Sequence, residues 1–139
     1  MSFVVRACLR TGVLFAVLGM GLGIYMGMTH EFQFAPVHAH VLLLGWVSML
    51  LYGLVYQAVP QAAQGFLPVV HWLVALTGMA TMTLSLAVMF AGHEAAEPFV
   101  ALGSILVISG AVLFAAIVFR ATRTAARVRA PAGLVAGAA

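Results

Sequence analysis

The chain has 139 residues, of which 65% are hydrophobic and only 6% are charged. Ordinary soluble domains carry about a quarter of charged residues. This composition excludes a soluble domain, and we expect an all-α integral membrane protein in the lipid bilayer. The formal net charge of +3 is small and sorted towards the two ends of the chain, so we do not interpret it as a nucleic-acid-binding surface.

Four apolar segments are each long enough to cross a bilayer as a helix, which takes about 20 residues. In chain order they are Ala7–Thr29, Pro36–Val59, Leu67–Gly92 and Pro98–Arg120. The segments between them are short, so we predict an up-down-up-down four-helix transmembrane bundle. The last three segments carry a proline (Pro36, Pro68 and Pro98) in the first turn, where the missing N–H breaks no helical hydrogen bond. We expect residues 1–121 to form the membrane domain and residues 122–139 to form a flexible cytoplasmic tail.

Charged residues are sorted by side. All six arginines lie around the start of the first segment or the end of the fourth: Arg6, Arg10, Arg120, Arg123, Arg127, Arg129. The glutamates lie in the loop between the first two segments and in the loop between the last two: Glu31, Glu94, Glu97. Basic residues mark the cytoplasmic side of a membrane protein. We therefore expect both termini in the cytoplasm and a multi-pass protein of a bacterial-type inner membrane. The N-terminus has basic residues before an apolar core, but no clear cleavage site follows, so we expect the first helix to be retained.

Small residues and one cysteine have simple interpretations. Gly19, Gly23 and Gly27 form a GxxxGxxxG pattern on one helix face, which lets two helices approach closely in lipid. The pattern favours packing within one subunit, and a contact between subunits is the alternative. The single Cys8 permits no internal disulfide, and we expect it to be a packing residue.

Histidines are the candidate functional residues, because polar groups inside a membrane are costly. His38 and His40 open the second apolar segment, in the stretch "PVHAHVLLLGW". Positions i and i+2 of an α-helix point about 200° apart. The two rings therefore do not chelate one small ion together, but each can ligate a larger group on its own side of the helix. Haem suits such rings, because its macrocycle is apolar and its iron takes imidazole axially.

A second ligand from the same chain is not available to His40 at its own depth. His71 lies near the opposite end of its helix, so the two heights differ by roughly 20 Å in a core about 30 Å thick. Ligands of one iron need nitrogens only about 4 Å apart. His30 and His93 stand beside the loops of the same side as His38 and His40, where they can also contact carbonyls or lipid.

The stretch "VHAHVLLLGWVSMLLYGLVYQAVP", followed by "HWLVALTGM", resembles helices ten and eleven of haem–copper oxidase subunit I, most closely the cbb-type oxidases and bacterial nitric-oxide reductases. The matching features are the H-x-H pair, Leu44-Gly45-Trp46, Tyr56, Pro60 and His71-Trp72-Leu73. In that family the first histidine of the pair binds the active-site haem and the second binds the low-spin haem. The resemblance thus implies haem b with His38 and His40 as axial ligands.

The same resemblance suggests how a lone four-helix chain completes its site. The family's large subunit is built from three four-helix arcs in pseudo-threefold order, and this chain looks like one arc. A homotrimer would imitate that subunit most directly, and a homodimer is the simpler alternative. His40 of one copy would then face His38 or His40 of the next.

The chain departs from the family at the copper site. It has no adjacent His-His pair and no intramembrane carboxylate or lysine to begin a proton path. We therefore do not expect a complete oxidase. Gly45 would let a porphyrin or a helix come close and Trp46 would pack on the ring edge, with ordinary helix packing as the alternative for both residues. His30 and His93 would serve haem propionates.

The sequence thus predicts a b-type cytochrome-like membrane protein that transfers electrons, with a redox partner, or binds a diatomic gas. The alternatives are a non-redox assembly or accessory protein, and a copper- or zinc-binding protein that uses His30, His38, His40 and His93 at the outer face. The sequence leaves the role of His71 open.

Overall fold

The computed structural model describes residues 1–129, with side chains through Arg123. These residues form helices and no strand. The elements are α1 (Phe3–Thr29), η1 (Phe32–Phe34), α2 (Ala35–His40), η2 (Val41–Ser48), α3 (Met49–Ala58), η3 (Pro60–Ala63), α4 (Leu67–Phe90), η4 (Glu94–Ala96) and α5 (Glu97–Arg129).

Four helices are long and apolar enough to cross a membrane, as predicted. They are Phe3–Thr29, Phe32–Ala58, Leu67–Phe90 and Glu94–Arg123. The second, which we call the second spanning helix, contains α2, η2 and α3. The predicted tail beyond residue 121 begins as a continuation of α5, which runs to Arg129, and residues 130–139 lie outside the described part of the chain.

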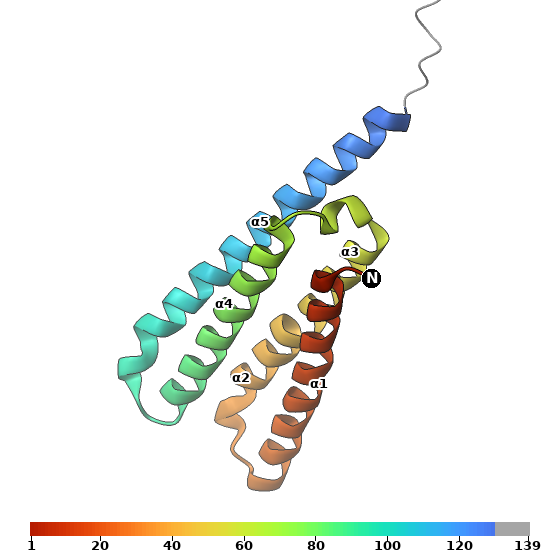
Figure 1. Cartoon of the computed structure of the whole chain (residues 1–139). Helices are drawn as coiled ribbons and strands as arrows, with labels where there is room; N and C mark the ends of the chain where they lie inside the picture. Colours follow the sequence, from red (N-terminus) through yellow and green to blue (C-terminus); the bar gives the residue numbers. More distant parts are fainter. Residues whose placement is uncertain (130–139) are drawn as a thin grey trace, which may run out of the picture.

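Two helix pairs make up the molecule (Figure 1): α1 packs along the second spanning helix, and α4 packs along α5. Glycines allow both close approaches. A Cβ added at Gly103 would lie 2.4 Å from the backbone nitrogen of Met82, and one at Gly78 would lie 2.8 Å from that of Val107. The backbones of α4 and α5 therefore touch at positions where only glycine fits.

The two pairs share a buried core at the end that carries Arg6, Arg10, Arg120 and Arg123, here called the arginine end, and α2 and η2 also contact α4 further along the molecule. A core cluster there joins α1, α3, η3 and α5: Val4, Val5, Cys8, Tyr56, Ala62, Ile117, Ala121. The Trp72 indole of α4 also donates a hydrogen bond to the Thr11 hydroxyl of α1 (3.2 Å). Cys8 is fully buried in this cluster, in agreement with the predicted packing role.

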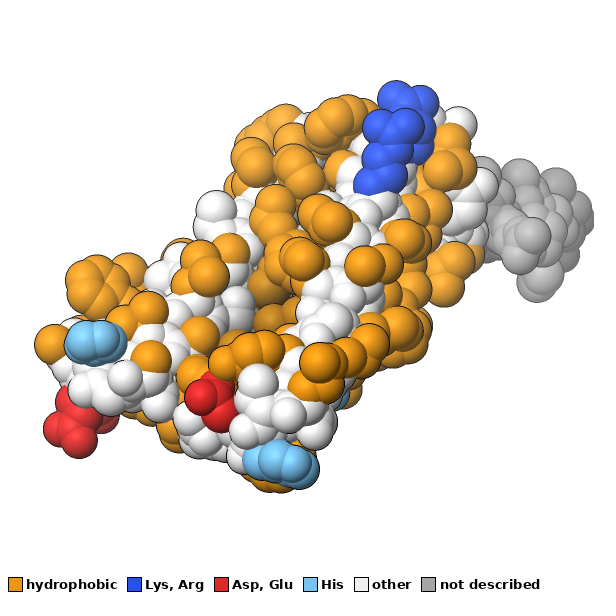
Figure 2. Space-filling model, turned by 90° about the horizontal axis from the view of Figure 1, so that it is seen from below, with side chains coloured by type: hydrophobic (Ala, Val, Ile, Leu, Met, Phe, Trp, Pro, Cys, Tyr) orange, Lys and Arg blue, Asp and Glu red, His pale blue; other side chains and the backbone are white. Residues whose placement is uncertain are grey.

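The opposite end carries His30, His38, His40 and His93 together with the three glutamates, and is here called the histidine end. Figure 2 views the molecule from this side, with acidic and histidine side chains in the foreground. Large apolar side chains remain exposed along all four spanning helices, among them Ile24, Leu43, Leu84 and Ile108. Such a surface is suited to lipid, since hydrocarbon has no need of polar side chains.

Candidate functional site

His38 lies against α1 within the same chain. Its Nδ1 donates a hydrogen bond to the backbone carbonyl of Gly19, at 2.9 Å. The ring fills the space above Gly23, where an added Cβ would come within 2.9 Å of the His38 Cε1 atom. Gly23 thus makes room for this imidazole, and Gly19 makes room for the Leu42 side chain, so two glycines of the GxxxGxxxG pattern serve packing inside the subunit; Gly27 has nothing within 4 Å.

His40 also uses its Nδ1 to donate a hydrogen bond to a backbone carbonyl. Its Nδ1 donates to the backbone oxygen of Pro36, one turn earlier in α2, at 2.6 Å. The ring is partly exposed. A carbonyl oxygen only accepts hydrogen bonds, so the proton of each imidazole is held on Nδ1 and the Nε2 lone pair is available.

The Nε2 atoms of His38 and His40 have no hydrogen-bond partner within the described part of the chain and are not fully enclosed. Among the described residues, the only fully enclosed side-chain nitrogen or oxygen without a partner is His71 Nε2. Histidines that ligate a metal usually donate their other ring N–H to a carbonyl or carboxylate, which fixes the ring and its tautomer. His38 and His40 therefore both have the form of an Nε2 metal ligand.

The two rings are held on an α-helical segment, so the expected separation of about 200° applies to them. His38 faces α1, and His40 leaves the helix in another direction. Within the described residues, no three or more His, Cys, Asp or Glu side chains are grouped closely enough to hold a metal ion. The structure thus does not assemble the four outer-face histidines into the copper or zinc site considered above.

A π-helical segment, η2, follows His40 directly and covers Val41–Ser48. The Ser48 hydroxyl donates to the Leu43 carbonyl, five residues earlier, at 2.8 Å. π-Helical turns are rare and are often found at functional sites. The sequence did not reveal this feature, and the Gly45 and Ser48 pair inside an otherwise apolar run is its only visible signal.

Gly45 and Trp46 lie within η2 and differ in surroundings. An added Cβ at Gly45 would come within 2.8 Å of the Phe15 side chain of α1. Gly45 therefore allows α1 and the second spanning helix to pack closely. Of the two roles that the sequence left open, close approach of a helix rather than of a porphyrin is the one that the structure shows. Trp46 is partly buried.

His30 and His93 are both exposed at the histidine end, beside the loops. His30 caps α1 in the left-handed conformation (φ 60°), and its backbone N–H donates to the Met26 carbonyl. Left-handed caps are common at helix ends, though glycine or asparagine is the usual residue. His30 therefore has a backbone role in addition to the predicted one, and neither ring is directed by a side-chain hydrogen bond.

His71 lies in a different environment, at the arginine end. Its side chain has 0% exposure. A hydrogen bond of 2.9 Å joins its Nδ1 to the Tyr56 hydroxyl. The rings of Tyr52 and Phe114 pack on it, with centroid distances of 4.6 and 5.1 Å. His71 is thus enclosed within its own chain, far along the molecule from His38 and His40, and does not share a ligand site with them.

Comparison with known proteins gave no match: no family model fits the chain, and no curated protein or solved structure is significantly similar.

Proposed function

We propose that the chain is a membrane cytochrome-like protein that binds haem b through His38 and His40, at a contact between copies of the chain. The observation that supports this most strongly is the pair of imidazoles whose Nδ1 protons are held by the Gly19 and Pro36 carbonyls. Each ring is thereby fixed in orientation, and its Nε2 is the nitrogen left for a ligand. Fixing the ring beforehand lowers the entropic cost of ligation.

Haem suits these rings better than a bare ion does. A zinc ion is held by three or four protein ligands around one point, and the described residues offer no such group. A haem iron needs only one imidazole from each side of the macrocycle. Apolar side chains that follow His40, such as Leu43 and Val47, are exposed and offer contact to an apolar ring.

The second axial ligand of His40 has to come from another copy. In this chain His71 is enclosed at the opposite end, and His38 leaves the helix in a different direction. The resemblance to haem–copper oxidase subunit I favours a homotrimer in which neighbouring second spanning helices face one another, with a homodimer as the simpler arrangement. Gly45 is not part of this site because Phe15 covers it.

Bound haem would supply one-electron chemistry when both axial positions are filled, or a diatomic-gas site when one stays open. The residues of this chain would hold the iron and exclude water from it. Since the arginines gather at one end, we assign that end and both termini to the cytoplasmic side of a bacterial-type inner membrane. The haem site then lies near the outer face.

The test is a reduced-minus-oxidised absorption spectrum of the purified protein and its variants. His40→Ala is expected to remove or shift the haem bands, and His38→Ala to do the same. Gln33→Ala is the control, because this exposed polar residue at the same end of the molecule has no part in the proposed haem site and its loss should leave the band positions unchanged. Unchanged spectra for both helix variants would contradict the proposal.

Two further measurements test the axial ligands directly. Added imidazole should restore the wild-type spectrum of a folded alanine variant, because it refills the vacated axial position. Carbon monoxide should bind only if one axial position is open, and so separates a gas-binding haem from a six-coordinate electron carrier.

A further inference from the structure

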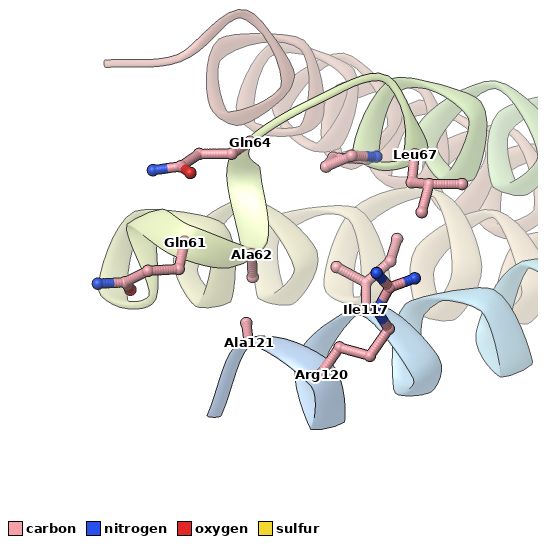
Figure 3. Close-up of a pocket in the computed structure, with 8 residues that line it drawn as sticks. Gln61, Ala62, Gln64, Leu67, Ile117, Arg120 and Ala121 are labelled. Atoms are coloured by element: carbon pink, nitrogen blue, oxygen red, sulfur yellow. The ribbon is translucent and has the colours of Figure 1, made fainter. Parts of the chain in front are cut away.

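A cavity of about 290 Å³ lies at the arginine end, away from the histidines. Its walls come from η3 and the loop after it, from the start of α4, and from α5 (Figure 3). The residues that matter here are Gln61, Gln64, Leu67, Pro68, Ile117 and Arg120. They come from three separate segments, so the fold itself shapes the cavity.

The lining is electropositive. Arg120 supplies a guanidinium, which points along the cavity towards Leu67, and the carboxamides of Gln61 and Gln64 lie on the other side (Figure 3). Helix α4 begins at Leu67, and no side chain caps its first turn. The N-terminus of a helix carries a partial positive charge, which favours an anion. In this first turn the attraction comes from that charge alone, because Pro68 has no N–H and the Val69 and Val70 N–H groups donate to the Phe66 carbonyl.

The cavity also has an apolar side, formed by Leu67, Pro68 and Ile117. Phe66, directly before α4, is 72% exposed. The cavity lies between the end of the second spanning helix at Ala58 and the start of the third at Leu67. This is the level at which lipid headgroups meet the hydrocarbon, and the site therefore joins a polar, positive lining to an apolar floor.

We propose that this cavity binds the headgroup of an anionic phospholipid, with the phosphodiester at Arg120, near the positive end of the α4 helix dipole, and the acyl chains along Leu67 and Phe66. Arginine pairs with phosphate through several N–H donors, so it is the residue suited to this role. A headgroup with no net charge, such as phosphatidylcholine, would bind more weakly, because its positively charged ammonium group would be repelled by the Arg120 guanidinium.

Native mass spectrometry of the intact protein in detergent, titrated with phosphatidylglycerol or phosphatidylcholine, tests the assignment. Arg120→Ala is expected to weaken phosphatidylglycerol binding about tenfold, the range for loss of a hydrogen bond to a charged group. Arg123→Ala is the matched control, three residues further along α5 and outside the cavity lining; we expect a change of about twofold at most.

A second pair of variants guards against misfolding of Arg120→Ala. Gln64 and Gln57 are both exposed, and only Gln64 lines the cavity. Gln64→Glu should weaken phosphatidylglycerol binding by repulsion, whereas Gln57→Glu should leave it close to wild type.

Three outcomes would overturn the assignment. One is equal loss in Arg120→Ala and Arg123→Ala, which would reflect general surface charge alone. Another is equal binding of phosphatidylcholine and phosphatidylglycerol. The third is full competition by millimolar inorganic phosphate, which would reassign the cavity to a free anion.

Discussion

At the scale of single residues, the shared feature of His38 and His40 is the hydrogen bond from Nδ1 to a backbone carbonyl. These bonds decide which ring nitrogen is free, and they come from the local fold. Gly19 supplies one carbonyl across the helix contact, and Pro36 supplies the other from the preceding turn. The two imidazoles are therefore oriented before any ligand arrives.

The packing of His38 against α1 predicts that alanine substitutions at Gly23 and Gly27, two glycines of the same motif, have different effects on the haem spectrum. Gly23→Ala places a methyl group 2.9 Å from the His38 ring, so the ring has to move and the haem bands should shift or weaken. Gly27→Ala meets nothing within 4 Å and should leave the spectrum unchanged. Equal spectra for the two variants would show that the position of His38 has no bearing on the pigment.

The buried Tyr56–His71 pair at the arginine end predicts that its loss lowers the stability of the protein and leaves the haem spectrum unchanged. Tyr56→Phe removes the hydroxyl bonded to His71 Nδ1 and leaves that enclosed imidazole without a hydrogen-bond partner. The free energy of unfolding should fall by about 1–3 kcal/mol. Tyr52→Phe is the control, because Tyr52 packs on the same ring and no hydrogen bond joins its hydroxyl to His71. Thermal unfolding in detergent measures the difference, and an equal loss in both variants would contradict it.

At the scale of elements, glycines set the distances between helices. The α4–α5 contact depends on Gly78 and Gly103, and the contact of α1 with the second spanning helix depends on Gly12, Gly19 and Gly45. In lipid, association of helices relies on such close packing, since burial of apolar surface gives little gain there.

Gly103→Ala is accordingly expected to separate α4 from α5. Its Cβ would lie 2.4 Å from the Met82 backbone nitrogen, which no side-chain rotation relieves. Overpacking of this kind costs about 1–3 kcal/mol. Gly21→Ala, with no atom within 4 Å, should leave the unfolding temperature near that of wild type; comparable destabilisation by both changes would argue against glycine-limited packing.

The sequence predicted the four spans closely because apolar length is a strong signal in membrane proteins. It did not predict η2, because π-helical turns have no simple residue pattern. The Tyr56–His71 hydrogen bond was within reach of the sequence: both residues lie within about a turn of one short loop, so they share a depth. This bond was not predicted from the sequence, because the depth of His71 was compared only with that of His40, as a second iron ligand.

At the scale of the whole molecule, the two helix pairs are joined by the core at the arginine end, and the histidine pair lies at the other end. Each chain offers imidazoles on different sides of one helix, and it has no group of three or more metal-ligating side chains among its described residues. The proposed haem site would be completed only when copies of the chain associate. This is the physical reason for expecting haem and oligomer together.

The haem content of the purified wild-type protein tests this account most directly. After expression with ample haem supply, the account predicts Soret and α bands that respond to dithionite, and a fixed ratio of haem to polypeptide that falls when the oligomer is dissociated. A folded oligomer without pigment, or pigment retained in full by isolated monomers, would contradict it.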